Sequence, residues 1–144
     1  MNVQSILGSK GDAVETIAQT ATLFEAARQL GERRIGALVV SGDGRAIEGI
    51  VSERDIVRAT AGAGATALEQ AVGSVMSTDV VTCGCGDGVD QLMSLMTDRR
   101  IRHLPVVDDH GHLAGIISIG DVVKARLAEL VHENEALTQY ISGH

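Results

Sequence analysis

The residues best suited to chemistry in this chain form a motif that occurs twice, Gly-Ile-x-Ser-x-x-Asp. Its members are Gly49, Ile50, Ser52 and Asp55 in the first copy and Gly115, Ile116, Ser118 and Asp121 in the second. A serine that ends a strand and enters a helix places a hydroxyl and backbone N–H groups at the positive end of the helix dipole, which suits a phosphate. A carboxylate in the first helical turn offers only acceptors and can bind the two hydroxyls of a ribose. Each copy therefore describes half of a nucleotide site.

The same spacing also has a purely structural explanation. Ser-x-x-Asp is a helix capping box, which contributes about 1 kcal/mol to stability and needs no ligand. Duplication would preserve a cap as readily as a binding site. The presence of the motif in both copies therefore leaves both explanations open.

The motif belongs to a longer internal repeat with an offset of 66 residues. Residues 35–59 align with 101–125 without a gap, and ten of these 25 positions are identical. Residues 3–7 resemble 72–76 at an offset of 69, which implies three extra residues near positions 8–12 of the first copy. Such a repeat indicates two copies of one structural unit, each of which needs the other to bury its apolar face.

Hydrophobic periodicity assigns the same elements to each copy. Helices are expected over 23–30 and 89–96, and hairpin strands over 37–40 with 47–51 and over 104–107 with 113–117. Short strands are expected at 14–17 and 80–83, helical periodicity returns after Ser52 and Ser118, and the stretch 61–67 is the expected linker. The sequence thus predicts an α/β (α+β) fold of two strand-helix-strand-strand-helix motifs, packed with pseudo-two-fold symmetry. The first motif with an N-terminal segment spans 1–66, and the second, with a long C-terminal helix, spans 67–144.

Composition restricts the class of protein. A chain of 144 residues with 44% hydrophobic residues can form one compact core, and its net charge of −7 argues against nucleic acid or an anionic membrane as a partner. We find no signal peptide and no run of 18 apolar residues, so a cytoplasmic protein is expected. Cys83 and Cys85 are too close for an unstrained disulfide and lack a second pair at zinc-site spacing, so no metal site is expected.

The last predicted helix carries a heptad seam between positions 121 and 141. Its members, at alternating spacings of four and three, are Val123, Leu127, Leu130, Asn134, Leu137 and Ile141. Such a helix either lies on its own domain or pairs with another chain. A polar asparagine inside an apolar seam is a device that sets register between helices, which favours a homodimer.

The segments GIVSERDIVRA and RHLPVVDDHGHLAGIISIGDVVKA resemble the paired CBS domain, or Bateman module, of small stand-alone bacterial proteins with two CBS motifs. The resemblance implies that the two motifs pack by their strands into a flat disc with two clefts. It further implies that these clefts bind adenine nucleotides such as AMP, ATP or NAD(H), that the repeated Ser and Asp contact phosphate and ribose, and that many such modules dimerise. Covalent chemistry is not expected, and we assign no catalytic residue.

The two clefts are not expected to be alike. Arg102 and His103 stand where the first copy has Gly36 and Ala37, and Gly120 stands where the first copy has Arg54. A cation beside a small residue leaves room for a phosphate, so the cleft that carries Asp121 is the preferred site.

By the resemblance, residues of the first copy complete that cleft. The expected nucleotide-binding residues are Lys10, Gly11, Val14, Ile35, Gly36, Arg102, His103, Ile116, Ser118, Gly120 and Asp121. A possible second cleft comprises Ser52, Arg54, Asp55 and Val80, which either binds a ligand or holds an ion pair between Arg54 and Asp55 in its place.

Three function hypotheses remain open from the sequence. The leading one is a regulatory module that senses an adenine nucleotide and acts on an unknown effector protein. The second is a dimerising scaffold in which the repeated motif is only a helix cap. The third is a small nucleotide hydrolase that depends on His103.

Overall fold

The computed structural model describes residues 1–142, so the last two residues of the predicted second motif, 143 and 144, lie outside the described residues. In chain order its elements are α1 (Val3–Lys10), β1 (Thr16–Ile17), α2 (Leu23–Arg33), β2 (Ala37–Val40), β3 (Gly49–Ser52), α3 (Glu53–Ala63), the 3-10 helix η1 (Gly64–Glu69), α4 (Val72–Val75), β4 (Cys83–Gly84), α5 (Val89–Arg99), β5 (His103–Val107), β6 (Leu113–Ser118) and α6 (Ile119–Ser142).

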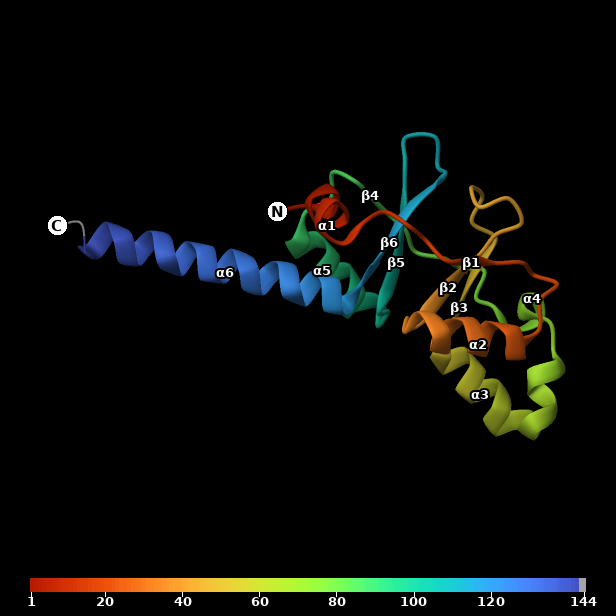
Figure 1. Ribbon diagram of the computed structural model, residues 1–144. Helices are drawn as coiled ribbons and strands as arrows, with labels where there is room; N and C mark the ends of the chain where they lie inside the picture. The colour runs from red at the N-terminus through yellow and green to blue at the C-terminus, as the bar shows by residue number, and fades with distance from the viewer. Residues whose placement is uncertain (143–144) are drawn as a thin grey trace.

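Each half of the molecule contains one three-stranded sheet, as Figure 1 shows. In the first sheet β1 runs parallel to β2 and β2 antiparallel to β3, and β4, β5 and β6 repeat this arrangement. The registers also correspond, because Ala37 pairs with Ser52 as His103 pairs with Ser118. The predicted fold class and the predicted order of elements are confirmed.

The segment between the copies differs from the prediction. The stretch 61–67 is not an open linker, because α3 continues to Ala63 and η1 follows directly. Ala67 is completely buried, which draws this stretch onto the first half. Tertiary packing here outweighs the two glycines that mark the stretch as a loop in the sequence.

The two halves exchange their short helices. Val3, Ile6 and Leu7 of α1 lie in the core of the second half, together with β5 and α5. In the same way Val72 of α4 lies in the core of the first half. The resemblance between residues 3–7 and 72–76 therefore reflects two equivalent helices, each of which completes the core of the opposite half.

The glycine of the repeated motif makes room for the exchanged helix. A Cβ at Gly49 would lie 2.6 Å from Met76 Sδ and 2.8 Å from the Ser77 carbonyl oxygen, just after α4. A Cβ at Gly115 would lie 2.8 Å from a methyl carbon of Leu7 in α1. The glycine in Gly-Ile-x-Ser-x-x-Asp is thus explained by close packing between the halves.

Helices α2 and α5 both end on an arginine in the left-handed region. Arg34 has a φ of 56° and Arg100 a φ of 54°, and each donates its backbone N–H to a carbonyl of the preceding turn. This position normally favours glycine, because a Cβ costs about 1 kcal/mol there. Two arginines are therefore kept at the expense of stability.

We expect Arg34→Gly to increase the free energy of unfolding by about 0.5–1 kcal/mol, because glycine relieves the backbone strain and part of that gain is offset by the greater entropy of the unfolded chain. Urea denaturation monitored by circular dichroism measures this change. Arg33→Gly, placed inside the last turn of α2, is the control and should be destabilising. Equal effects of the two substitutions would contradict the explanation.

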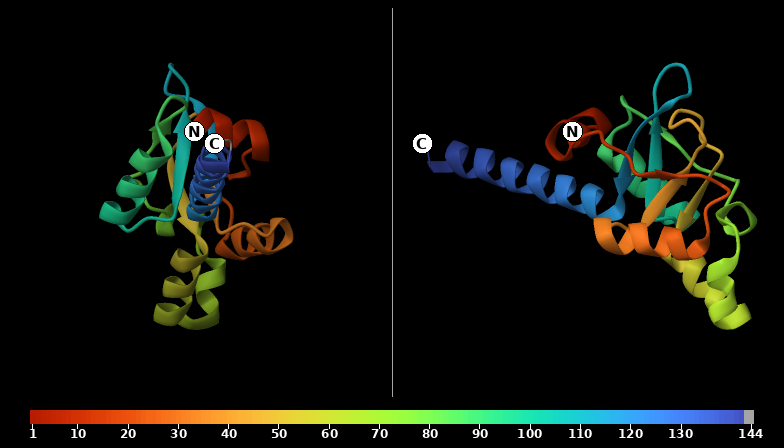
Figure 2. Two further views of the ribbon diagram at one scale, coloured as in Figure 1. Left: turned by 90° about the vertical axis from the view of Figure 1, so that its left-hand side faces the viewer. Right: turned by 45° about the vertical axis from the view of Figure 1, so that its right-hand side comes forward.

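The C-terminal helix leaves the body of the molecule. Val122 and Ala125 of α6 are buried, and the ion pair between the Met1 amino group and Glu129 (3.0 Å) holds this part of the helix to the N-terminus. All residues from 130 to 142 are exposed, and the helix projects as a single arm (Figures 1 and 2). The alternative in which the whole seam packs on its own domain is therefore wrong.

Candidate functional site

Both copies of the repeated motif form the helix cap that their spacing predicts. In the first copy Asp55 N donates to Ser52 Oγ (3.3 Å), and Asp55 Oδ2 accepts from Ser52 N (2.8 Å) and from Ser52 Oγ (3.0 Å). In the second copy Asp121 N donates to Ser118 Oγ (3.1 Å) and Ser118 N donates to Asp121 Oδ2 (2.9 Å). Among residues 1–142, neither Oδ1 atom receives a hydrogen bond, so the cap leaves one carboxylate oxygen available in each copy.

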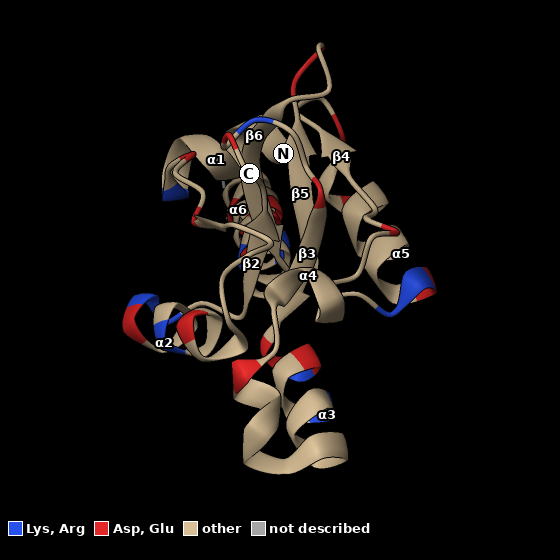
Figure 3. Ribbon diagram, turned by 90° about the vertical axis from the view of Figure 1, so that its right-hand side faces the viewer, with Lys and Arg blue, Asp and Glu red and all other residues tan. Residues whose placement is uncertain are grey.

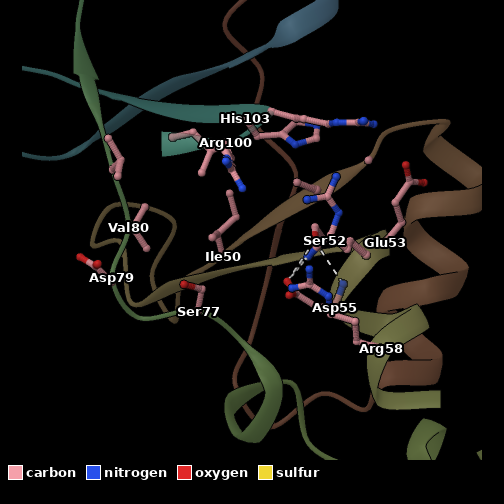
Figure 4. Close-up of a pocket in the computed structure, with 16 residues that line it drawn as sticks. Ile50, Ser52, Glu53, Asp55, Arg58, Ser77, Asp79, Val80, Arg100 and His103 are labelled. Carbon is pink, nitrogen blue, oxygen red and sulfur yellow. Dashed lines mark hydrogen bonds between the residues drawn. The ribbon is translucent and has the colours of Figure 1, made fainter. Parts of the chain in front are cut away.

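A cavity of about 250 Å³ lies between the two halves beside Asp55 (Figure 4). The first half contributes Gly36, Ala37, Ile50, Ser52, Glu53, Arg54, Asp55 and Arg58, and the second half contributes Ser77, Asp79, Val80, Val81, Arg100, Ile101, Arg102 and His103. Its volume is close to the lower end of small-molecule pockets, which span about 300–1,000 Å³. Since both halves line the cavity, the affinity of a ligand here would depend on their relative position.

The cavity is rich in positive charge although the whole chain carries a net charge of −7. Its four arginines, Arg54, Arg58, Arg100 and Arg102, outnumber the carboxylates of Glu53, Asp55 and Asp79. None of the ion pairs formed within residues 1–142 involves these four guanidinium groups. Figure 3 shows the charges at the end of α5 and at the start of α3 on the same side of the molecule. Unpaired guanidinium groups beside a cavity suit a phosphate.

His103 closes one side of the cavity. Its ring lies over Gly36, where a Cβ would be 3.1 Å from His103 Cε1. Burial lowers the pKa of His103, and the carboxylate of Glu53 opposes this shift. The imidazole is therefore neutral near pH 7, and an anion in the cavity would favour its protonated form.

In the second copy a lysine forms an ion pair with the carboxylate of the motif. Lys10 Nζ lies 2.7 Å from Asp121 Oδ2 and also donates to the Ile116 carbonyl oxygen at 3.0 Å. Partial burial acts to raise the pKa of Asp121, but the hydrogen bonds from Lys10 and Ser118 outweigh it and lower that pKa. The smaller cavity here, about 160 Å³ between α1 and α6, contains Lys10 and Asp121.

The three extra residues of the first copy explain this lysine. Helix α1 runs to Lys10, whereas α4 ends at Val75, before the position equivalent to Leu7. The insertion adds about one turn to α1, and the last residue of that turn is Lys10. The two clefts therefore differ because one short helix is longer than the other.

The structure places the residues predicted for the preferred site in two adjoining groups, since His103 pairs with Ser118 across β5 and β6 and the Arg102 carbonyl accepts a hydrogen bond from Ile119 N. Lys10, Ile116, Ser118 and Asp121 lie together, whereas Gly36, Arg102 and His103 line the cavity beside Asp55 with Ser52, Arg54, Asp55 and Val80. Gly11 follows α1, Val14 lies between α1 and β1, Ile35 lines a separate cavity between α2 and α3, and Gly120 lies near Ser118.

One expectation for the second cleft is wrong. Arg54 and Asp55 form no ion pair within the described chain, because the Asp55 carboxylate faces back to Ser52 in the cap. Arg58 and Arg100 were missed as cavity residues. Arg58 lies three positions after Asp55, on the same face of α3, which is a signal present in the sequence. Arg100 lines the cavity from the position just after α5, where the backbone is left-handed.

The comparison with known families now fits the geometry. Two segments, residues 11–62 and 72–128, match the model of the CBS domain. The chain belongs to the CBS domain family. The two segments correspond to the two halves of the structure, so the molecule is a pair of CBS domains.

Individual CBS relatives resemble the chain over most of its length. The CBS domain-containing protein CBSX3, mitochondrial, of Arabidopsis thaliana is 34% identical over 149 residues, which cover 98% of this chain and 72% of the relative. The CBS-domain containing protein ATU1752 of Agrobacterium tumefaciens has a crystal structure with a TM-score of 0.82 and 48% identity, covering 87% of this chain and 98% of that one. The CBS domain protein PAE2072 of Pyrobaculum aerophilum, solved in complex with AMP, has a TM-score of 0.77 and 29% identity, covering 92% of this chain and 99% of that one.

The cysteines and the possible metal ligands of this CBS pair do not form a further site in the described residues. Cys83 and Cys85 are free thiols, and burial, assisted by Asp87, raises the pKa of Cys83 to about 12. Within residues 1–142, no group of three or more His, Cys, Asp or Glu side chains is placed to hold a metal ion. Across the same residues, the helices are too short or too polar to cross a membrane.

Proposed function

We propose that this CBS pair is a non-catalytic regulatory module that binds an adenosine phosphate in the cavity beside Asp55. The observation that carries the proposal is the combination of a carboxylate with one oxygen available and four arginines without a carboxylate partner around one cavity. The carboxylate suits the ribose hydroxyls, the guanidinium groups suit the phosphate, and Ile50, Val80 and Ile101 offer apolar surface to a base. The AMP complex of the Pyrobaculum relative supports the ligand class.

The cleft beside Asp121 is proposed as the weaker site. A ribose there must share the carboxylate with Lys10, whose ammonium group lies 2.7 Å from Asp121 Oδ2 and offsets its negative charge. The sequence favours this cleft because Lys10 and Arg102 are both cationic, but the larger cavity supports the Asp55 side. The cavity size also favours AMP over ATP or NAD(H), which are larger.

A ligand that contacts both halves can regulate only if it prefers one of their relative positions. In the proposed module, AMP joins Asp55 of the first half to Arg100 and Arg102 of the second half. Such a bridge favours the arrangement in which Asp55 and the two arginines face one cavity. An effector protein that contacts both halves would read this difference, and a homodimer formed through α6 is part of the same proposal.

Isothermal titration calorimetry with AMP, ATP, NAD, NADH and adenosine tests the ligand class. We expect AMP to bind with a dissociation constant below about 100 μM, and adenosine at least about tenfold more weakly, because it lacks the phosphate. The proposal is wrong if none of these ligands binds below about 1 mM, which corresponds to about −4 kcal/mol. Phosphate release from AMP or ATP that requires His103 would instead support the hydrolase hypothesis.

The pair Arg100→Gly and Arg34→Gly separates binding from folding. Both substitutions replace an arginine whose backbone is in the left-handed region, so both should raise the free energy of unfolding. Only Arg100 lines the cavity beside Asp55. We expect Arg100→Gly to weaken AMP binding about tenfold, which is the loss of one charge-assisted hydrogen bond of about 1.5 kcal/mol. The scaffold hypothesis predicts that neither variant changes any ligand response.

Removing Lys10 should make the cleft beside Asp121 available to a ligand. We expect Lys10→Met to raise the AMP stoichiometry in calorimetry from one toward two per chain, because Asp121 loses its ion-pair partner. The loss of this half-buried pair should lower stability by about 1 kcal/mol or less. Lys124→Met is the control, since Lys124 lines the same small cavity but does not form an ion pair with Asp121 among the described contacts. A stoichiometry that stays at one in Lys10→Met would refute competition by Lys10.

A further inference from the structure

The apolar seam of α6 is exposed along its whole length. Its members are Val123, Leu127, Leu130, Asn134, Leu137 and Ile141, and the five apolar ones are 44–66% exposed. Residues 130–142 form an arm about 20 Å long at 1.5 Å per residue, without a buried residue. Elsewhere in the described chain most apolar side chains fill two cores, whereas this arm carries a continuous row of exposed ones.

The arm needs a partner to be a stable helix. In water a helix of this length is marginal by itself, and helical stability in proteins comes mostly from packing of an apolar face. We propose that α6 pairs with α6 of a second copy of this chain in a parallel, in-register coiled coil. This inference deepens the homodimer of the proposed function by assigning its surface and its orientation.

The spacing of the seam identifies a like helix as the occupant. Alternation of four and three residues is the pattern that lets two supercoiled helices insert their side chains into each other. A two-fold dimer requires a surface that is complementary to itself, and a straight heptad seam meets this requirement. Val122 and Ala125, which bind α6 to the body, face away from the seam, so the body does not obstruct the pairing.

Asn134 fixes the orientation. In a parallel pair each seam residue meets its own counterpart, so the amide of Asn134 can hydrogen-bond to the amide of the partner's Asn134. In an antiparallel pair centred on the seam, Asn134 would meet the partner's Leu130 and its amide would be buried without a hydrogen bond. An unsatisfied buried polar group costs about 1–3 kcal/mol, which disfavours the antiparallel arrangement.

The charges beside the seam agree with this orientation. Glu133 flanks Asn134, and in the antiparallel arrangement it would face the partner's Glu133. In the parallel arrangement Glu133 faces the partner's Thr138, and Arg126 faces the partner's Val131. Parallel pairing therefore avoids a like-charge contact at the middle of the helix.

The base of the arm is anchored to α1 by ion pairs. Arg126 donates to Glu129 at 3.0 Å, and Glu129 also binds the Met1 amino group, so α1 and α6 are tied together where α6 leaves the body. Since Asp121 of the same helix is held by Lys10 of α1, the weaker cleft beside Asp121 and the arm share one anchoring helix. A parallel pair thus places two sensing modules side by side at one end of a common stalk.

Sedimentation equilibrium of the full chain tests the pairing. We expect a mass twice that of one 15.0 kDa chain at 10 μM. The double variant Leu130→Glu with Leu137→Glu should be monomeric, with a dimer dissociation constant at least about 100-fold larger, because two apolar contacts per chain are replaced by facing carboxylates. The matched control, His132→Glu with Gln139→Glu, adds the same charges on the outer face of α6 and should remain dimeric. A monomeric wild type, or equal behaviour of the two double variants, overturns the proposal.

Disulfide trapping tests the orientation. Asn134→Cys, oxidised in air, should form a covalent dimer, whereas the wild type, which carries Cys83 and Cys85, and the outer-face variant Glu135→Cys should not. A dimer that Asn134→Cys fails to trap refutes the parallel register. Calorimetry with AMP on the monomeric double variant keeps the two proposals apart. AMP binding by a wild type that is monomeric refutes only the coiled coil, and a dimeric wild type that does not bind AMP refutes only the nucleotide site.

Discussion

Asp55→Asn is expected to weaken AMP binding by about 30- to 100-fold. The carboxylate is placed to accept two ribose hydroxyls, and charge-assisted hydrogen bonds of this kind together contribute about 2–3 kcal/mol. Asparagine keeps the size of the side chain and retains an oxygen for the cap with Ser52, so the fold of α3 should be preserved. Isothermal titration calorimetry measures the affinity, and circular dichroism during urea titration measures the stability.

The matched control for this substitution is Asp121→Asn, at the equivalent position of the second copy. Its AMP affinity should stay within about twofold of the wild type, because that carboxylate is occupied by Lys10. If Asp121→Asn loses the affinity and Asp55→Asn retains it, the cleft that the sequence favours is the main site. If both variants bind as the wild type does, the repeated Ser-x-x-Asp is only a helix cap.

Gly49→Val is expected to lower the free energy of unfolding by about 3 kcal/mol. The Cβ would lie 2.8 Å from the Ser77 carbonyl oxygen, and the backbone cannot move away because Ile50 and Ser77 exchange two hydrogen bonds of 3.0 and 2.9 Å. Gly31→Ala, inside α2, meets no atom within 4 Å and should be neutral or stabilising by up to about 1 kcal/mol. Urea denaturation compares the two variants.

The second copy offers an informative comparison for Gly49→Val. At Gly115 the nearest atoms belong to the flexible end of Leu7 and not to the backbone. Gly115→Ala should therefore cost less than Gly49→Ala, by about 1 kcal/mol, because a leucine side chain can adjust its rotamer. Equal losses at the two glycines would mean that the exchanged helices are held equally rigidly.

The internal repeat predicts most of the fold, because two sequences that share spacing and periodicity must form the same elements. The positions of β2 and of the start of α2 and α5 agree with the prediction to the residue. The exchange of α1 and α4 could not be deduced in this way, since an alignment shows which segments are equivalent but not which half each one contacts. The helical stretch 61–67 was missed because its glycines mark a loop, while the burial of Ala67 is a tertiary effect.

The sequence indicates which types of residue form the candidate site more completely than it indicates which of these residues lie together. Ser52, Asp55, Ser118 and Asp121 carry a spacing that specifies both a cap and a site, so the sequence identifies them. The sequence also shows the three extra residues in the first copy. It does not show that they lengthen α1 so that Lys10 reaches the carboxylate of Asp121. A cation near an acidic residue looks like a phosphate ligand in the sequence, but in the structure the two neutralise each other.

The exchanged short helices also bear on how such a protein could have arisen. A solitary copy of the unit carries a short helix that fits another copy's core, so it would leave its own core open and its short helix without a place to pack. Two solitary copies can complete each other's cores by exchanging these helices across a two-fold axis. Fusion of tandem genes then requires no new fold. It places both exchanged helices in a single chain. Afterwards the two copies are free to diverge, so that one retains in its pocket a carboxylate that is unpaired among the described residues and the other gains a lysine that pairs with its carboxylate.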